Sequence, residues 1–329
     1  MRLFHGTFAK LLIARFLQRI LVFMALLVLM SLLPRLLPGD AMSLLLESPA
    51  SFSLKQAEIR TLERQFGLYT SLPASVWGDI TSILGGDLGV SRLYGRPVTE
   101  VIAASFPWTA LLILGAIPLF LVTGVGLAIE GGRKPGSRPD RFLTVVMTVL
   151  AALPPFAAAS VLVLFFAVAF PILPASGAGS LIPPDDAIQR GLDIARHAIL
   201  PVIALALHEV TRYFFVLRAD MQLLTRQPFV QSALIRGVSG LRERRDYYLR
   251  NLMAAIVARL GHSISTLFSA VLFVEVTFSY PGIGLVAYQA ILDRDYVLLE
   301  GTVAVIAVIV LLLNWVLDVA SFALARTVQ

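Results

Sequence analysis

The chain has 329 residues, of which 57% are apolar and only 15% are charged, and its mean hydropathy is +0.82. Soluble domains carry roughly 25% charged residues, so this composition excludes a soluble globular protein and predicts an integral membrane protein. The net charge of +6 is spread over the segments between apolar runs, which excludes a basic nucleic-acid-binding domain, and the absence of cysteine excludes disulfides and thiolate metal sites.

Six segments are long and apolar enough to cross a bilayer, which takes about 20 helical residues. They cover residues 19–36, 106–129, 142–170, 198–217, 254–278 and 301–324. The first follows basic residues, as a signal peptide does, but it has no convincing small-x-small cleavage site before Pro34. We therefore predict an all-α membrane protein with six transmembrane helices, the first of them retained.

The long segment between the first two spans predicts structure of its own. Residues 53–56 form a capping-box pattern and are followed by apolar residues at helical spacing up to Phe66, so we expect a surface helix there. Residues 85–98, GGDLGVSRLYGRPV, are rich in turn-forming residues. They predict an irregular connection outside the lipid, because unpaired backbone groups cannot face hydrocarbon.

The distribution of lysine and arginine predicts the orientation of the chain. These residues gather before the first span, in residues 130–141 and in residues 218–250. Positive residues in short loops mark the cytoplasmic side of a membrane. We therefore expect these three segments and both termini to be cytoplasmic, and residues 37–105 to lie on the opposite side.

A polar interruption at residues 226–253 separates the fourth span from the fifth. Pro228 suits a first helical turn and Gly237 suits a left-handed helix stop, which predicts a helix of roughly two turns between them. Its apolar stripe consists of Phe229, Val230, Ala233 and Leu234, and its polar face of Gln227, Gln231 and Arg236. So short a helix needs a surface to dock against. The residues alone leave open a partner-docking site or an ordinary basic loop.

The last external loop contains a turn. Tyr280 is followed by Pro281, Gly282, Ile283 and Gly284, a pattern typical of turns. We expect this turn to lead into a short helix over residues 285–292 that packs at the membrane surface or re-enters the protein.

No pattern for catalysis or cofactor binding is present. The four histidines lack metal-ligand spacing, there is no Gly-x-x-x-x-Gly-Lys-Ser/Thr loop to hold nucleotide phosphates, and there is no Gly-x-Ser-x-Gly elbow. We therefore expect no metal site, no bound cofactor and no enzymatic activity in this chain.

Ionisable residues within the spans are the remaining candidates for function. They are Glu209, Arg212, Arg259, Glu275 and Asp318. Glu209 and Arg212 are three residues apart on one helix, so they could form a simple intrahelical pair or lie on a substrate pathway. Glu275 and Asp318 lie close to predicted helix ends, where we expect water to reach them.

Four groups of motifs carry a resemblance to a known family. They are Leu37-Pro38-Gly39-Asp40; residues 66–68 with Gly86-Asp87-Leu88-Gly89 and Gly95-Arg96-Pro97-Val98; residues 173–177 with 197–201; and Val274-Glu275 through residues 278–284 to Asp293-Arg294-Asp295-Tyr296. In this order, between six spans, the chain resembles a permease subunit of the dipeptide, oligopeptide and nickel class of ATP-binding-cassette importers over almost its whole length.

The resemblance implies a type I importer transmembrane domain. Residues 1–97 would hold the first helix and the external segment, and residues 98–325 the permease core with its coupling loop at 218–253. In that family this loop seats in a groove of the ATPase through a Glu-Ala-Ala-x-x-x-Gly motif. The matching residues are Gln231, Ser232, Ala233 and Gly237, with Phe229 and Arg236 beside them. Gln231 replaces the acidic residue of the motif, and Ala255 its later proline.

The resemblance also implies partners and location. A second, related permease subunit, two ATPase subunits that bind ATP and Mg²⁺, and an extracytoplasmic substrate-binding protein are expected in a bacterial cytoplasmic membrane. The implied activity is peptide import by alternating access, without ATP hydrolysis by this chain. A nickel or metal-chelate importer of the same class is the alternative cargo, and a secondary transporter is the alternative outside the class.

Overall fold

The computed structural model describes residues 16–32 and 72–327, with side chains for residues 16–32 and 76–319. In these ranges all regular structure is helical apart from one β-bridge between Val90 and Pro97. The surface helix predicted around residues 53–66 lies outside the described residues. The chain divides into two compact units, the first formed by residues 1–102 and 290–309 and the second by residues 103–289 and 310–329.

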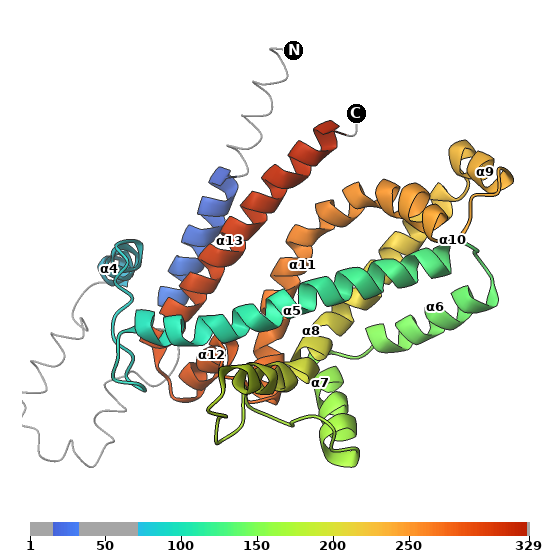
Figure 1. The fold of residues 1–329 in the computed structure, drawn as a ribbon. Helices are drawn as coiled ribbons and strands as arrows, with labels where there is room; N and C mark the ends of the chain where they lie inside the picture. The colour runs from blue at the N-terminus through green and yellow to red at the C-terminus, as the bar shows by residue number, and fades with distance from the viewer. Residues whose placement is uncertain (1–15, 33–71, 328–329) are drawn as a thin grey trace, which may run out of the picture. The chain divides into compact units, whose positions relative to one another are not determined.

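Figure 1 labels the helices in chain order. They are α4 (Leu72–Leu84), α5 (Val98–Gly132), α6 (Arg138–Ala151), α7 (Pro155–Val163), α8 (Ala187–Leu224), α9 (Pro228–Ile235), α10 (Gly240–Arg242), α11 (Arg250–Thr277), α12 (Ile283–Leu292) and α13 (Tyr296–Thr327). Two π-helical segments, η2 (Leu164–Ala169) and η3 (Glu243–Leu249), extend α7 and join α10 to α11. A further helix, Phe16–Leu32, precedes them.

The described helices include several of membrane-spanning length. Val98–Gly132, Ala187–Leu224, Gly240–Thr277 and Tyr296–Val319 are each long and apolar enough to cross a bilayer, and a bent helix pair supplies a further candidate. Phe16–Leu32 is apolar but shorter. The chain is therefore a multi-pass membrane protein whose described residues are helical, while the count of six spans stays a prediction.

The third predicted span, residues 142–170, is not one straight helix. Arg138–Ala151 and Pro155–Ala169 meet at a bend of 100°. The bend falls at Pro154 and Pro155, of which Pro154 is the extended N-cap of α7. Proline lacks an N–H and disfavours helical geometry in the residue before it, so two consecutive prolines end one helix and begin another.

The polar interruption is shorter in structure than in sequence. A continuous helix runs from Gly240 to Thr277, so residues 240–253 belong to it rather than to a loop before Ala254. Polar residues do not stop a helix that emerges from the lipid, because water accepts their side chains. The irregular part of the interruption is confined to the segments on either side of α9.

The first unit contains its own small core and an ordered connection. Leu27, Ile80 and Ala304 pack together. In the predicted irregular segment, Ser91 Oγ and the Leu93 N–H donate hydrogen bonds of 2.7 and 2.9 Å to the carboxylate of Asp295, which directly precedes α13 and is 1% exposed. The segment before α5 is therefore irregular, as predicted, but it is tied to the start of α13.

The second unit is organised around α8, which packs against α6, α7 and α11 (Figure 1). Its buried residues include Phe120 and Tyr213, whose rings lie 5.0 Å apart. At Gly132 of α5 an added Cβ would lie 2.4 Å from the Cβ of Met221 on α8. This small residue lets the two helices approach closely, as in many membrane helix pairs.

Candidate functional site

The short helix predicted between the fourth and fifth spans is present as α9. Pro228 occupies its first turn after Gln227, which has extended backbone. At the other end Gly237 has φ +82°, its N–H bonds the Leu234 carbonyl at 2.9 Å, and the Val238 N–H bonds the Ala233 carbonyl at 3.1 Å. This pair of bonds is a Schellman motif, which needs a left-handed residue at the glycine position. Both predicted ends of the helix are confirmed.

The apolar stripe predicted for α9 is only partly covered by the chain itself. Val230 is 1% exposed and Ala233 2% exposed, so these two residues seat the helix. Phe229 and Leu234 are 43% and 38% exposed, and Ile235 is 85% exposed. Gln227, Gln231 and Arg236, the predicted polar face, are exposed, and so is Ser232. The helix is therefore held on one side and presents uncovered apolar side chains on others.

Gln231 connects α9 to the end of α8. Its side-chain amide donates a hydrogen bond to the Thr225 carbonyl at 2.6 Å, where Thr225 is the C-cap of α8. The last carbonyls of a helix have no partner within the helix, so this bond satisfies one of them. An ionised glutamate has no N–H to donate and could not replace it.

Ion pairs connect the helices that precede and follow α9 in the chain. Asp140 of α6, which is 1% exposed, accepts two hydrogen bonds from Arg218 of α8 at 2.5 and 2.8 Å. Arg244 of η3 pairs with Glu130 near the end of α5. Arg259 of α11 lies 3.3 Å from Asp220 of α8. These pairs connect α5, α6 and α8 with the helix that follows α9.

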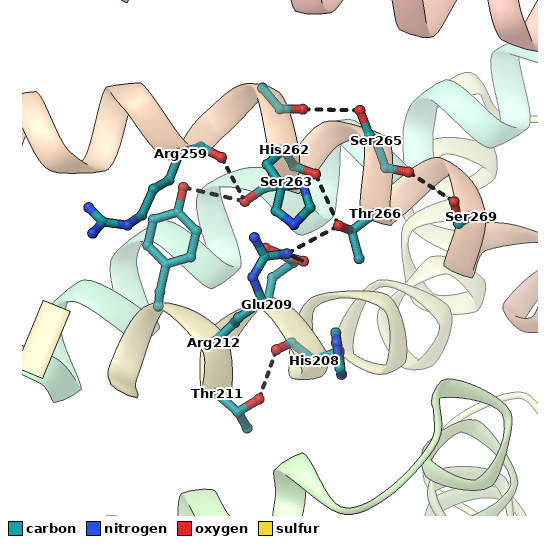
Figure 2. A network of polar contacts seen from close by, with 12 residues as sticks. His208, Glu209, Thr211, Arg212, Arg259, His262, Ser263, Ser265, Thr266 and Ser269 are labelled. Carbon is teal, nitrogen blue, oxygen red and sulfur yellow. Dashed lines mark hydrogen bonds and ion pairs between the residues drawn. The ribbon is translucent and has the colours of Figure 1, made fainter. Parts of the chain in front are cut away.

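A second polar site lies within the spans, between α8 and α11. Glu209 is 1% exposed and its Oε1 accepts a hydrogen bond from Arg212 Nη1 at 3.0 Å. The same nitrogen donates to Thr266 Oγ1 on α11 at 3.1 Å. Figure 2 shows Arg212 between Glu209 and Thr266. The sequence predicted the pairing of Glu209 with Arg212, and the structure adds the bond to a second helix.

Hydroxyl groups continue this site along α11. Ser263, Ser265, Thr266 and Ser269 each bond a carbonyl one turn earlier, and Asn314 of α13 donates to Ser265 Oγ at 2.7 Å. Two atoms at the site, Glu209 Oε2 and His208 Nδ1, are buried without a hydrogen-bond partner among the described residues. No group of three histidine, aspartate or glutamate side chains in the described chain is arranged to hold a metal ion.

Glu275 is placed differently from the prediction. We expected water to reach it near a helix end, but it is 0% exposed. Its Oε1 accepts a hydrogen bond from Thr109 Oγ1 at 2.6 Å, and its Oε2 accepts from the N–H groups of Gly284 at 2.6 Å and Leu285 at 3.1 Å. The start of α12 folds back over the carboxylate, because a helix N-terminus carries unpaired N–H groups that favour a negative charge.

The predicted external turn forms around this carboxylate. The Gly282 N–H bonds the Tyr280 carbonyl at 2.7 Å, and α12 begins at Ile283, directly after Pro281 and Gly282. A Cβ at Gly282 would lie 2.1 Å from Glu275 Oε1, and one at Gly284 would lie 2.6 Å from the Cα of Leu272. Both glycines are needed because the backbone passes too close to α11 for any side chain.

Sequence reasoning missed several of these residues. The ion pair of Asp140 had a signal, since Ser137 and Asp140 precede an apolar run in a capping pattern and Ser137 is the N-cap of α6. Thr109 and Thr266 had none, because a single threonine in a membrane helix does not reveal a partner on another helix. Asp318 and Arg259, noted from the sequence, are partly exposed.

Comparisons with known proteins agree with the predicted class. The family described as binding-protein-dependent transport system inner membrane component matches residues 121–329. A putative peptide permease protein of Brucella ovis is 28% identical over 90% of this chain and 92% of that protein. The glutathione transport system permease protein GsiC of Salmonella paratyphi A is 27% identical over 92% and 93%. The putrescine export system permease protein SapB of Escherichia coli is 26% identical over 75% and 83%.

Proposed function

Because the chain belongs to the family of binding-protein-dependent transport system inner membrane components, we propose that it is the membrane-spanning subunit of an ATP-driven peptide importer. The observation that carries the proposal is α9, a short helix that buries Val230 and Ala233 and is bonded to the C-cap of α8 by Gln231, while its other apolar residues are uncovered. A helix of eight residues is stable only when packed. The exposed apolar side chains of α9 therefore indicate that a partner protein covers them.

The partner at α9 is an ATPase subunit. Phe229, Gln231, Ser232, Ala233, Arg236 and Gly237 form or flank the helix that enters its groove. ATP and Mg²⁺ bind to two such ATPase subunits, and this chain binds no cofactor and hydrolyses nothing. When the ATPases close, α9 moves with them, its bond to the end of α8 passes the motion to that helix, and the ion pairs among α5, α6, α8 and α11 pass it on.

Transport then proceeds by alternating access. The membrane helices have an inward-open and an outward-open arrangement, and the ATPases bias the equilibrium between them. An extracytoplasmic binding protein delivers the cargo, and a second, related permease subunit completes the pathway. The chain crosses a bacterial cytoplasmic membrane six times with both termini in the cytoplasm, as the distribution of its arginines favours.

Peptides are the favoured cargo. The Brucella ovis relative is named for peptides and the Salmonella paratyphi A relative for the peptide glutathione, and both align with at least 90% of this chain. The Escherichia coli relative, named for putrescine export, aligns with 75%. Uptake of a labelled dipeptide, putrescine and Ni²⁺ by the reconstituted complex separates peptide transport from a polyamine or a metal alternative.

The coupling role is tested by matched variants of two exposed isoleucines. Ile235 is on α9 and is 85% exposed, and Ile188 is at the start of α8 and is 74% exposed. We expect Ile235→Ser to weaken co-purification of the ATPases and to lower substrate-stimulated ATP hydrolysis several-fold, while Ile188→Ser changes neither. Equal behaviour of the two variants, or ATPases that bind without α9, would contradict the proposal.

Gly237 provides a second test. An added Cβ meets no atom within 4 Å, so the chain itself has room there, although φ +82° disfavours most side chains. Asparagine tolerates this backbone conformation better than tryptophan. We expect Gly237→Asn to retain coupling and Gly237→Trp to abolish it with normal membrane insertion. Transport by the purified chain without ATPases would instead favour a secondary transporter.

A further inference from the structure

One face of α11 is polar and exposed within a membrane span. His262 and Ser269 are exposed and Thr266 is partly exposed, at a spacing of four and three residues that places them on one helical face. These residues lie inside the candidate span Gly240–Thr277. We call His262, Thr266 and Ser269 the polar stripe.

Arg212 of α8 lies beside the polar stripe (Figure 2). Its Nη1 bonds Glu209 and Thr266, and 28% of its side chain is exposed. Its other N–H groups have no hydrogen bond within the described chain. Glu209 is 1% exposed, so its carboxylate balances the positive charge of Arg212 from a buried position.

Such a surface cannot favourably face lipid. A charged or polar side chain in the hydrocarbon layer is costly and normally faces a water-filled cavity or another protein. The guanidinium is planar and its free N–H groups form a fork that matches a carboxylate. Its charge is partly balanced before any ligand arrives, which lowers the cost of keeping it within the membrane.

We propose that the polar stripe and Arg212 form one wall of the transport pathway, where Arg212 binds a carboxylate of the passing cargo, such as the C-terminus of a peptide. The inference rests on the proposed function and predicts that the cargo carries a carboxylate. A cationic cargo does not fit this site, because the one unpartnered oxygen of Glu209 is buried. Glu209 is a positioning residue that orients Arg212.

The absence of cysteine from the chain allows a direct test of the wall. Ser269→Cys and, as a control at an exposed apolar position of another candidate span, Val122→Cys on α5, which is 74% exposed, are placed in the reconstituted complex. A charged, membrane-impermeant thiol reagent is added to the complex with ATP held on its ATPase subunits and to the complex without ATP. Labelling of this subunit is read by mass spectrometry. We expect Ser269→Cys to react in at least one state, more slowly with peptide present, and Val122→Cys not to react.

Leu181→Cys serves as the positive control, because Leu181 lies in the loop before α8 and is fully exposed. If Leu181→Cys reacts and Ser269→Cys is protected in both states, the stripe is covered by lipid or by the second subunit, and the proposed wall is overturned.

Carboxylate binding is tested with peptide pairs that differ only in a free or amidated C-terminus and that the binding protein delivers equally well. We expect Arg212→Gln to lower uptake of the free acid by roughly tenfold, the loss of about one charged hydrogen bond, with little change for the amide. Arg212→Lys should restore part of the difference. Arg190→Gln is the matched control, because Arg190 is exposed and bonds only the Pro184 carbonyl.

The outcomes separate the two proposals. An equal loss for both peptides with Arg212→Gln indicates a purely structural arginine, and an unchanged ratio excludes carboxylate binding; either result overturns the inference. Failure of the proposed function would appear differently, as a wild-type complex with no ATP-dependent uptake of any peptide.

Discussion

The hydroxyl of Thr109 on α5 donates a hydrogen bond of 2.6 Å to the carboxylate of Glu275 at the end of α11. The same hydroxyl accepts the Ile283 N–H at 2.8 Å, and the carboxylate accepts the next two N–H groups of α12. Two side chains thus satisfy three of the N–H groups at the start of α12. This arrangement fixes the turn before α12 to α5 and α11.

Replacing this carboxylate by an amide should loosen the turn. In Glu275→Gln one of the two carboxylate oxygens becomes an NH₂ group, so either the Thr109 hydroxyl or the N–H groups of Gly284 and Leu285 lose their acceptor. We expect a loss of about 2 kcal/mol in the free energy of unfolding and faster hydrogen exchange over residues 283–292. The control is Thr277→Val, whose hydroxyl bonds only the Phe273 carbonyl of its own helix. Equal effects of the two variants would show that the carboxylate does not hold α12.

Two glycines should respond in opposite ways to alanine. At Gly284 a Cβ would lie 2.6 Å from the Leu272 Cα, a backbone atom that cannot move aside, whereas at Gly126 of α5 nothing lies within 4 Å. We expect Gly284→Ala to lower stability by about 1 to 3 kcal/mol. Gly126→Ala should be neutral or stabilising by up to about 1 kcal/mol, because alanine favours helix. Thermal unfolding in detergent compares them, and tolerance of Gly284→Ala would contradict the close approach of α12 to α11.

The buried pair of Asp140 with Arg218 should matter more than a surface pair. Asp140→Asn leaves Arg218, which is 23% exposed, without its countercharge, and we expect a loss of roughly 2 to 4 kcal/mol. Asp246 pairs with Arg245, which is 76% exposed, so Asp246→Asn should cost less than about 1 kcal/mol. The difference in unfolding temperature measures this contrast, and similar values for both variants would refute it.

Local features of this fold could be predicted from sequence, whereas contacts between distant residues could not. The ends of α9 follow from Pro228 and Gly237, which act on their immediate neighbours. The bend between α6 and α7 was also local, since two consecutive prolines mark it, although apolarity alone predicted one span. In contrast, the burial of Glu275 depends on Thr109, 166 residues away, and that of Asp140 on Arg218, 78 residues away. Hydropathy identifies neither pair.

Gln231 stands where the resemblance implies an acidic residue in α9, and substitution of Gln231 tests what the amide does there. Gln231→Glu removes the amide that donates to the Thr225 carbonyl and places a carboxylate beside that oxygen. We expect faster hydrogen exchange over α9 and a loss of about 1 kcal/mol in its local stability. Gln227→Glu is the matched control: Gln227 is the N-cap and makes no side-chain cap bond, so a negative charge there should favour the helix slightly. If both variants behave alike, the amide of Gln231 does not hold α9 against the end of α8.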